Sequence, residues 1–237
     1  MLCAQQSKGK DRLLPPEKHL LKQRATHRRR LRRAERYLQD VESPIGEWIE
    51  ESGRCQLEIA WDRSLYEALV RAIAHQQLHG RAAETILGRL IEAFHRPQQT
   101  FPTPLQLARA QPERLRACGF SAAKVAAIQG IARATHREQI PTRNQADQLN
   151  DEELIEKLLP LRGVGRWTVE MLLIFTLGRL DVMPVDDFGV RSGLKHLYQF
   201  ERTPSKFDFA ELTDRWAPYR SVGAWYLWRL ADARKLS

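Results

Sequence analysis

The stretch from Leu158 to Arg191 constrains the fold more than any other part of this 237-residue chain. It opens with a glycine turn at residues 162–165, continues as an apolar run over residues 167–177, and ends at two adjacent carboxylates, Asp186 and Asp187. Glycine tolerates positive φ and lets another backbone approach closely. A turn that feeds a helix N-terminus directs backbone N–H groups outward, which suits a phosphate. The stretch therefore predicts a turn that binds the phosphate of a nucleic-acid backbone, with a carboxylate beside it.

Helical periodicity dominates the rest of the chain, and no segment shows the sustained alternation of a strand. Ser64, Ser121 and Asn150 are placed to cap helices that begin at the next residue. Pro112 divides residues 105–115 into two short helices, and residues 140–150 are expected to form a loop. The sequence therefore predicts an all-α chain. Further helices are expected within residues 45–60, 83–94, 122–135, 151–159, 165–177, 188–198, 206–216 and 221–230.

Length and composition exclude several classes of protein. The chain suits one large domain or two small ones. It has no run of 18 apolar residues, so we expect no membrane span, and its basic N-terminus lacks the apolar core of a secretory signal. Cys3, Cys55 and Cys118 are too far apart for a disulfide ladder or a Cys-x-x-Cys metal site. We expect an intracellular protein, cytoplasmic in a bacterium or nuclear in a eukaryote.

The net charge of +9 is concentrated at one end. Residues 1–36 hold twelve Lys and Arg but only three Asp and Glu, which leaves 26 residues of each sign in the rest of the chain. One interpretation is a flexible basic arm that adds phosphate contacts to DNA binding. The alternatives are a solvated extension or a start site placed too early. We divide the chain into this arm, residues 1–36, and a domain over residues 37–237.

The central stretch resembles the helix–hairpin–helix, Gly/Pro, Asp superfamily of DNA glycosylases. The resemblance is carried by residues 159–165, by Trp167-Thr168, and by Asp187 twenty positions after Trp167. It is closest to the alkylpurine branch, 3-methyladenine DNA glycosylase II, and runs from about Ser64 to the C-terminus. It implies two helical lobes, a helix–hairpin–helix motif and a DNA-binding cleft between the lobes. It further implies a monomer that flips alkylated purines out of double-stranded DNA.

Asp187 is the catalytic candidate that the resemblance implies. Cleavage of an N-glycosidic bond builds positive charge on the sugar, as in the oxocarbenium-like states of glycoside hydrolysis. A carboxylate near the sugar can stabilise that charge or activate water. Asp186 is the alternative, or a supporting acid, and either residue could simply cap the helix that starts at Phe188.

Two tryptophans are candidates for the base pocket. Relatives that also cut the strand have a lysine at the position of Trp167, which forms a Schiff base with the sugar. Tryptophan cannot do so, and its ring could instead face an electron-poor base. Trp228, twelve residues after Trp216, falls where the family has an active-site tryptophan. The alternative for both is a place in the core, which is our expectation for Trp225.

Two further segments are DNA-binding candidates. By the family resemblance, Leu78 is the candidate wedge that fills the space of a flipped base, with Gln77 and His79 as its neighbours. The alternative is an ordinary turn with Leu78 in the core. Arg162, Gly163, Val164 and Gly165 would hold one phosphate irrespective of sequence. We expect no resident metal, since no cysteine or carboxylate completes a set with the histidines. The sequence is silent on the monovalent cation that superfamily members often hold at the hairpin.

The resemblance implies a monofunctional glycosylase that removes alkylated purines such as 3-methyladenine and 7-methylguanine. A cationic alkylated purine leaves easily and suits an aromatic face. One alternative is a glycosylase for a mismatched adenine or an oxidised base. Another is a non-catalytic helix–hairpin–helix module, which would need the two hairpin glycines but not Asp187.

Overall fold

The computed structural model describes residues 16–78, 80–97 and 99–235, and these residues form helices but no strand. The all-α prediction is therefore confirmed. Among the described residues we find no helix whose length and hydropathy would let it span a lipid bilayer. In chain order the helices are α1 (Pro16–Asp40), α2 (Ile45–Ser52), α3 (Leu65–His75), α4 (Gly80–Ala93), α5 (Pro104–Arg109), α6 (Pro112–Ala117), α7 (Ala122–His136), α8 (Arg143–Ala146), α9 (Asp151–Leu158), α10 (Arg166–Leu172), the π-helix η1 (Leu173–Leu177), α11 (Phe188–Leu197), α12 (Lys206–Asp214) and α13 (Arg220–Lys235).

Local signals place most helix starts correctly. The side chains of Ser64, Ser121 and Asn150 each accept a hydrogen bond from the backbone N–H three residues later, as predicted. Two features differ from expectation. The predicted loop over residues 140–150 contains the one-turn helix α8, which begins with a capping box at Thr142. The second helix of the hairpin changes from α-helix to π-helix after Leu172.

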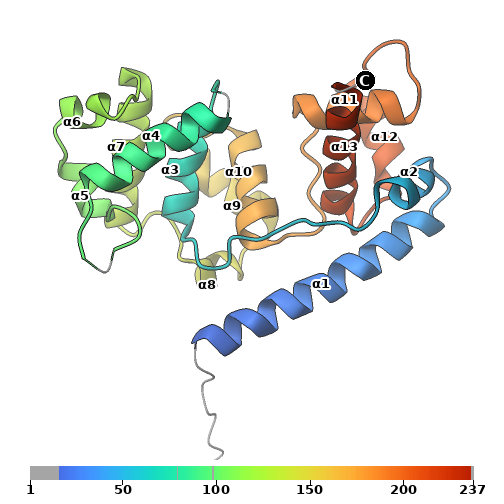
Figure 1. Ribbon diagram of the computed structural model, residues 1–237, viewed down its shortest axis with the longest axis horizontal. Coiled ribbons are helices and arrows are strands. Elements are labelled where there is room, and N and C mark those ends of the chain that lie inside the picture. Colours follow the sequence, from blue (N-terminus) through green and yellow to red (C-terminus); the bar gives the residue numbers. More distant parts are fainter. Residues whose placement is uncertain (1–15, 79, 98, 236–237) are drawn as a thin grey trace, which may run out of the picture.

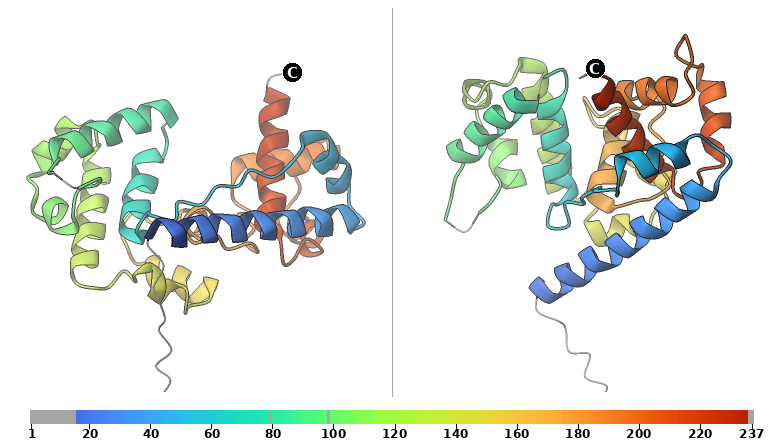
Figure 2. Two further views of the ribbon diagram at one scale, coloured as in Figure 1. Left: turned by 60° about the horizontal axis from the view of Figure 1, so that its bottom comes forward. Right: turned by 45° about the vertical axis from the view of Figure 1, so that its right-hand side comes forward.

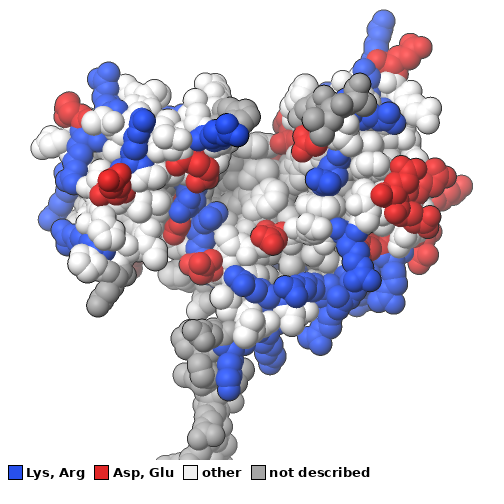
Figure 3. Space-filling view, viewed as in Figure 1, with Lys and Arg blue, Asp and Glu red and all other residues white. Residues whose placement is uncertain are grey.

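The helices form two lobes, as predicted (Figures 1 and 2). Helices α3 to α7 make up the first lobe; α10 packs against α3 on its inner side, and α9 packs against α10. Helices α11 to α13 make up the second lobe. It is completed by α2 from the N-terminal part of the chain, where Trp48 Nε1 donates to Tyr226 O at 2.9 Å. Figure 3 shows that the surface is hollowed between the two lobes.

Helix α1 stands where a flexible N-terminal arm was expected. Residues 1–15 lie outside the described residues, but from Pro16 the chain is one helix that runs past the boundary expected at residue 36. Side chains that recur every three or four residues, among them His27, Leu31, Ala34 and Leu38, are buried against the body. The prediction of a flexible arm is therefore wrong for residues 27–36, because this apolar stripe docks the helix.

Candidate active site

Asp187 is the N-cap residue of α11. Its Oδ1 accepts a hydrogen bond from Val190 N at 2.9 Å, so the carboxylate caps the helix. The preceding segment is tied to the start of α13. Ser221 N donates to Leu180 O at 2.9 Å, and Val182 N donates to Ser221 Oγ at 2.9 Å. The backbone before Asp187 is therefore fixed by α13, and the backbone after it is fixed by α11.

Two indoles converge on this carboxylate from different helices. Trp167, the second residue of α10, donates from Nε1 to Asp187 Oδ2 at 2.8 Å. Trp228 of α13 donates from Nε1 to Asp187 Oδ1 at 2.7 Å. Hydrogen bonds to a charged acceptor are the stronger kind, so together they hold the carboxylate in one orientation. Trp167 is 37% exposed, so part of its side chain is open to solvent. The structure thus brings the three predicted residues into one cluster.

Several residues that support the cluster were missed from the sequence. The ring of Phe175, in the π-helix, lies 5.5 Å from that of Trp228 at an interplanar angle of 33°. Such π-helical segments often occur at functional sites. A Cβ at Gly189 would lie 2.7 Å from Trp228 Cδ1, so only glycine leaves room for the indole. Gly193, one turn later, meets the backbone of Leu227. The spacing of these two glycines, four residues apart, was the available signal for a close helix contact.

Asp186 has a different role from its neighbour. Its carboxylate is half-exposed and pairs with Lys206 of α12, with Oδ1 and Nζ 2.5 Å apart. The expectation that Asp186 could be the helix cap is wrong, because the cap hydrogen bond is made by Asp187. Asp187 therefore makes the cap that the sequence left open between the two adjacent acids.

The hairpin between α9 and α10 has the geometry that its glycines suggested. Gly163 adopts φ +81°, and an added Cβ would lie 3.0 Å from Ala127 Cβ. Val164 is buried and anchors the turn, whereas Arg162 is exposed. Gly165 is the N-cap of α10 and offers no side-chain cap, so the first N–H groups of that helix face outward. This arrangement suits a phosphate oxygen.

The turn after α3 lies beside this hairpin. Gln76 Nε2 donates to Gly163 O at 2.9 Å. Gln77 is exposed with φ +54°, and Leu78 is 40% exposed, so Leu78 is not a core residue. His79 lies outside the described residues. Lys124 of α7 donates from Nζ to Ala74 O at 2.8 Å and to Gln76 O at 2.7 Å. These bonds to the last carbonyls of α3 hold the turn in place.

Metal ligands are absent from the part of the chain that the structure describes: no three His, Cys, Asp or Glu residues are grouped to hold an ion. The monovalent cation that superfamily members often hold at the hairpin, on which the sequence is silent, stays untested.

This geometry can be compared with known proteins. A model of the HhH-GPD superfamily base excision DNA repair proteins matches residues 70–218, which include the hairpin, Trp167 and Asp187. The chain belongs to this superfamily. The "DNA-3-methyladenine glycosylase 1" of Schizosaccharomyces pombe is 46% identical over 173 residues, which cover 72% of this chain and 75% of the relative. The "Alkylbase DNA glycosidase-like protein mag2" of the same yeast is 35% identical, over 84% and 93% of the two chains.

Solved structures of the superfamily have the same fold. The Schizosaccharomyces pombe 3-methyladenine DNA glycosylase Mag1, in complex with abasic DNA, matches with a TM-score of 0.76 and 41% identity, over 83% of this chain and 95% of that one. A DNA-3-methyladenine glycosidase from Bacillus halodurans matches with a TM-score of 0.73 and 32% identity, over 83% and 88%. The resemblance stated from the hairpin and Asp187 is confirmed.

Proposed function

We propose that this chain is a monofunctional DNA glycosylase of base excision repair, which hydrolyses the N-glycosidic bond of alkylated purines in double-stranded DNA. The observation that carries the proposal is the Asp187 carboxylate, which accepts one indole N–H from Trp167 of α10 and another from Trp228 of α13. The relatives named as 3-methyladenine glycosylases support the substrate class.

The chemistry follows from the charges that develop. As the base departs, the sugar becomes cationic, and a fixed carboxylate nearby stabilises that charge without reorganisation. An alkylated purine is itself cationic and is attracted to the face of an indole. The exposed ring of Trp167 offers such a face. A base that is already a good leaving group needs little acid catalysis, so selectivity can come from ease of flipping.

The same residues account for hydrolysis without strand cleavage. A glycosylase that also acts as a lyase needs an amine to form a Schiff base with the sugar. Trp167 stands where lyase relatives have that lysine, and an indole cannot form the adduct. Water is then the nucleophile that captures the sugar cation.

DNA contacts are assigned to the two turns beside the cluster. The hairpin, residues 162–165, would hold one phosphate through its N–H groups. Leu78, exposed on the adjacent turn with Gln77 and His79 as its neighbours in the chain, would fill the space left by the flipped base. Gln76 of this turn donates a hydrogen bond to Gly163 O of the hairpin, so the two DNA-contacting turns are held next to each other. We further propose that the enzyme acts as a monomer.

The deciding experiment is a panel of duplexes, each carrying one lesion, scored for base release with and without alkali. Release from the alkylated duplexes, with strand breaks only after alkali, supports the proposal. Release from an adenine mismatch or an oxidised base instead would point to a glycosylase for another lesion. Duplex binding without any base release would identify a non-catalytic module.

A further inference from the structure

The outer surface of α1 is strongly basic. The helix contains nine Lys and Arg and three Asp and Glu. Arg24, Arg28 and Arg32 recur every four residues and therefore form a single row, about 6 Å apart at 1.5 Å rise per residue. The row flanks the buried stripe of the helix. In Figure 3 the blue side chains follow the lower edge of the molecule, along the course of α1 in Figure 1.

This row forms one wall of a groove. Residues 54–61, which connect the two lobes, form the other wall, and the groove has a volume of about 440 Å³. Four arginines line it, together with His27 and two glutamates. The lining charges are Arg24, Arg28, Arg32 and Arg54 against Glu35 and Glu58.

The arginine side chains are not neutralised by the protein. Within the described ranges, none of the four makes a hydrogen bond or an ion pair through its side chain. Glu35 is engaged elsewhere: it is buried, and its Oε1 accepts from Cys55 N at 2.5 Å and from Tyr226 OH at 3.2 Å. Glu58 is the remaining acidic side chain of the groove. Unpaired guanidinium groups in a row create a positive field that favours an anion.

His27 is a buried polar residue in the lining of the groove. Its side chain is 95% buried, since 5% of its surface is exposed. Its Nε2 lies 2.9 Å from Leu57 O, and because a carbonyl can only accept, Nε2 carries the hydrogen. Nδ1 has no partner in the described part of the chain. With the hydrogen on Nε2, Nδ1 of the neutral ring is an acceptor, which can accept from a water or a sugar hydroxyl but does not bond a phosphate oxygen, so the arginines carry the anion contacts.

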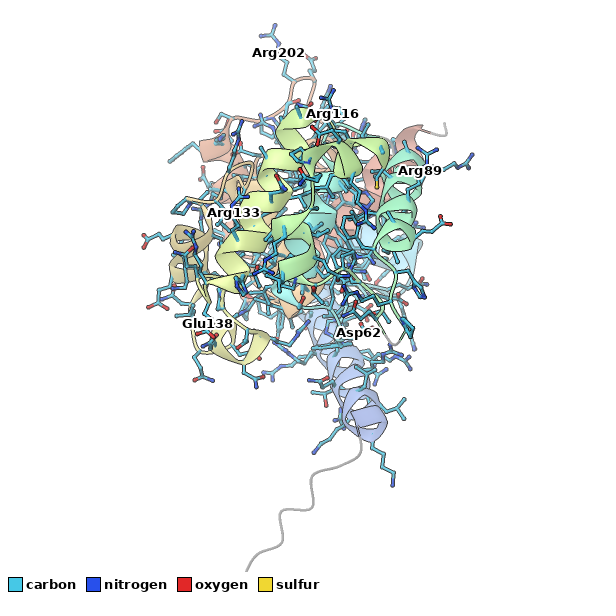
Figure 4. The ribbon with its side chains drawn as sticks, turned by 90° about the vertical axis from the view of Figure 1, so that its left-hand side faces the viewer. Asp62, Arg89, Arg116, Arg133, Glu138 and Arg202 are labelled. Atoms are coloured by element: carbon cyan, nitrogen blue, oxygen red, sulfur yellow. The ribbon has the colours of Figure 1, made fainter. Side chains whose placement is uncertain are left out.

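The groove lies away from the candidate active site. Figure 1 shows α1 along the lower side of the molecule, from below α8 to the second lobe, whereas α3 ends at the upper side, where Gln76 contacts the hairpin at Gly163. In Figure 4 the N-terminal part of α1 projects below the first lobe into open space. A duplex held by the hairpin and the turn at the upper edge would therefore leave the α1 groove free.

We propose that the groove between α1 and residues 54–61 is a second nucleic-acid site, which binds the phosphodiester backbone of a segment other than the one being repaired. A free phosphate ion shares the chemistry of the ligand, but the row of arginines favours a polymer. Arg24 and Arg32 are eight residues apart, or about 12 Å along the helix. Positive charge spread over this distance suits the successive phosphates of a polymer better than a single small anion. Arginine also matches phosphate geometry through its planar fork.

The test uses the full chain and two undamaged 12-base-pair duplexes that carry donor and acceptor dyes. Energy transfer reports one protein holding both duplexes. The groove variant is Arg24→Gln, Arg28→Gln and Arg32→Gln together. The matched control is Arg29→Gln, Arg30→Gln and Arg33→Gln, which removes the same charge from the same helix but from side chains that do not line the groove. Circular dichroism verifies that both variants keep the helix.

Wild type and the control should show energy transfer, and the groove variant should lose it. The log–log salt slope for the second duplex should fall by about 0.9 for each phosphate that the arginines no longer neutralise. Equal reductions in the two variants, or no transfer in wild type, would overturn the proposal. So would displacement of the duplex by millimolar inorganic phosphate, which would indicate a free-anion site, or by polyglutamate at equal charge, which would indicate an acidic protein partner. Base release is not needed for this test, so it can fail or succeed independently of the proposed function.

Discussion

Gly189 and Trp228 approach so closely that a methyl group on the glycine would lie 2.7 Å from the indole Cδ1. The same added carbon would lie 3.2 Å from Asp187 Oδ1. The absence of a side chain at Gly189 thus allows α13 to bring its indole N–H to the carboxylate at the start of α11. This contact predicts that a side chain at Gly189 would disturb the hydrogen bond between the indole and the carboxylate.

Gly189→Ala should displace the Trp228 ring. A misplacement of about 1 Å near the reacting groups can cost about 10²-fold in rate, so we expect single-turnover base release to fall by roughly that factor. Gly130→Ala is the matched control, because that glycine lies in α7 with nothing within 4 Å of the added carbon. The control should keep full activity and gain about 0.5–1 kcal/mol of stability from higher helix propensity. Normal base release in Gly189→Ala would show that the indole position is unimportant.

Asp187→Asn removes the charge and keeps a good helix cap. Base release under single-turnover conditions should slow by roughly 10²-fold or more, with little change in melting temperature. Asp186→Asn breaks only a half-exposed pair with Lys206, worth about 0–1 kcal/mol, and should leave the rate near normal. Loss of base release in Asp186→Asn but not in Asp187→Asn would show that Asp186 is the catalytic acid of the pair.

Trp167→Phe keeps an aromatic ring but removes the N–H that reaches Asp187 Oδ2. A hydrogen bond to a charged group contributes about 1.5 kcal/mol at the low end, which corresponds to about tenfold in rate if it orients the reacting carboxylate. Trp167→Ala should be slower still, because the stacking face is removed as well.

Wild-type enzyme treated with borohydride during turnover should form no covalent DNA adduct, and recovery of such an adduct would contradict the assignment of hydrolysis.

Lys124→Met removes the ammonium that donates to the carbonyls of Ala74 and Gln76. Burial lowers the pKa of this ammonium, so the two carbonyls offset part of the cost of holding its charge there. Loss of these charge-assisted bonds should loosen the Gln77-Leu78 turn and cost about 1.5–3 kcal/mol of stability. Chemical denaturation measures the stability, and the affinity for abasic duplex should weaken together with it. Lys157→Met, near the end of α9, serves as a control without such contacts in the described structure.

Much of the architecture could be predicted from local chemistry. Ser121 and Asn150 mark helix starts because a short polar side chain satisfies the first free N–H groups, whatever packs around it. The hairpin was recognisable because only glycine accepts the φ of +81° at Gly163 without strain. The acid candidate followed from its register with Trp167. These signals act within a few residues of one another.

Other features were decided only by tertiary packing. The sequence by itself determined an all-helical chain with a glycine hairpin and two adjacent candidate acids, because capping, periodicity and glycine turns are local properties. It could not show that Trp167 and Trp228, 61 residues apart, would donate to the two oxygens of one carboxylate. Nor could the sequence show that Asp187 rather than Asp186 caps α11, or that α1 packs against the rest of the protein. Those outcomes depend on how closely helices approach, which is decided by the volumes of side chains that meet only in the folded protein.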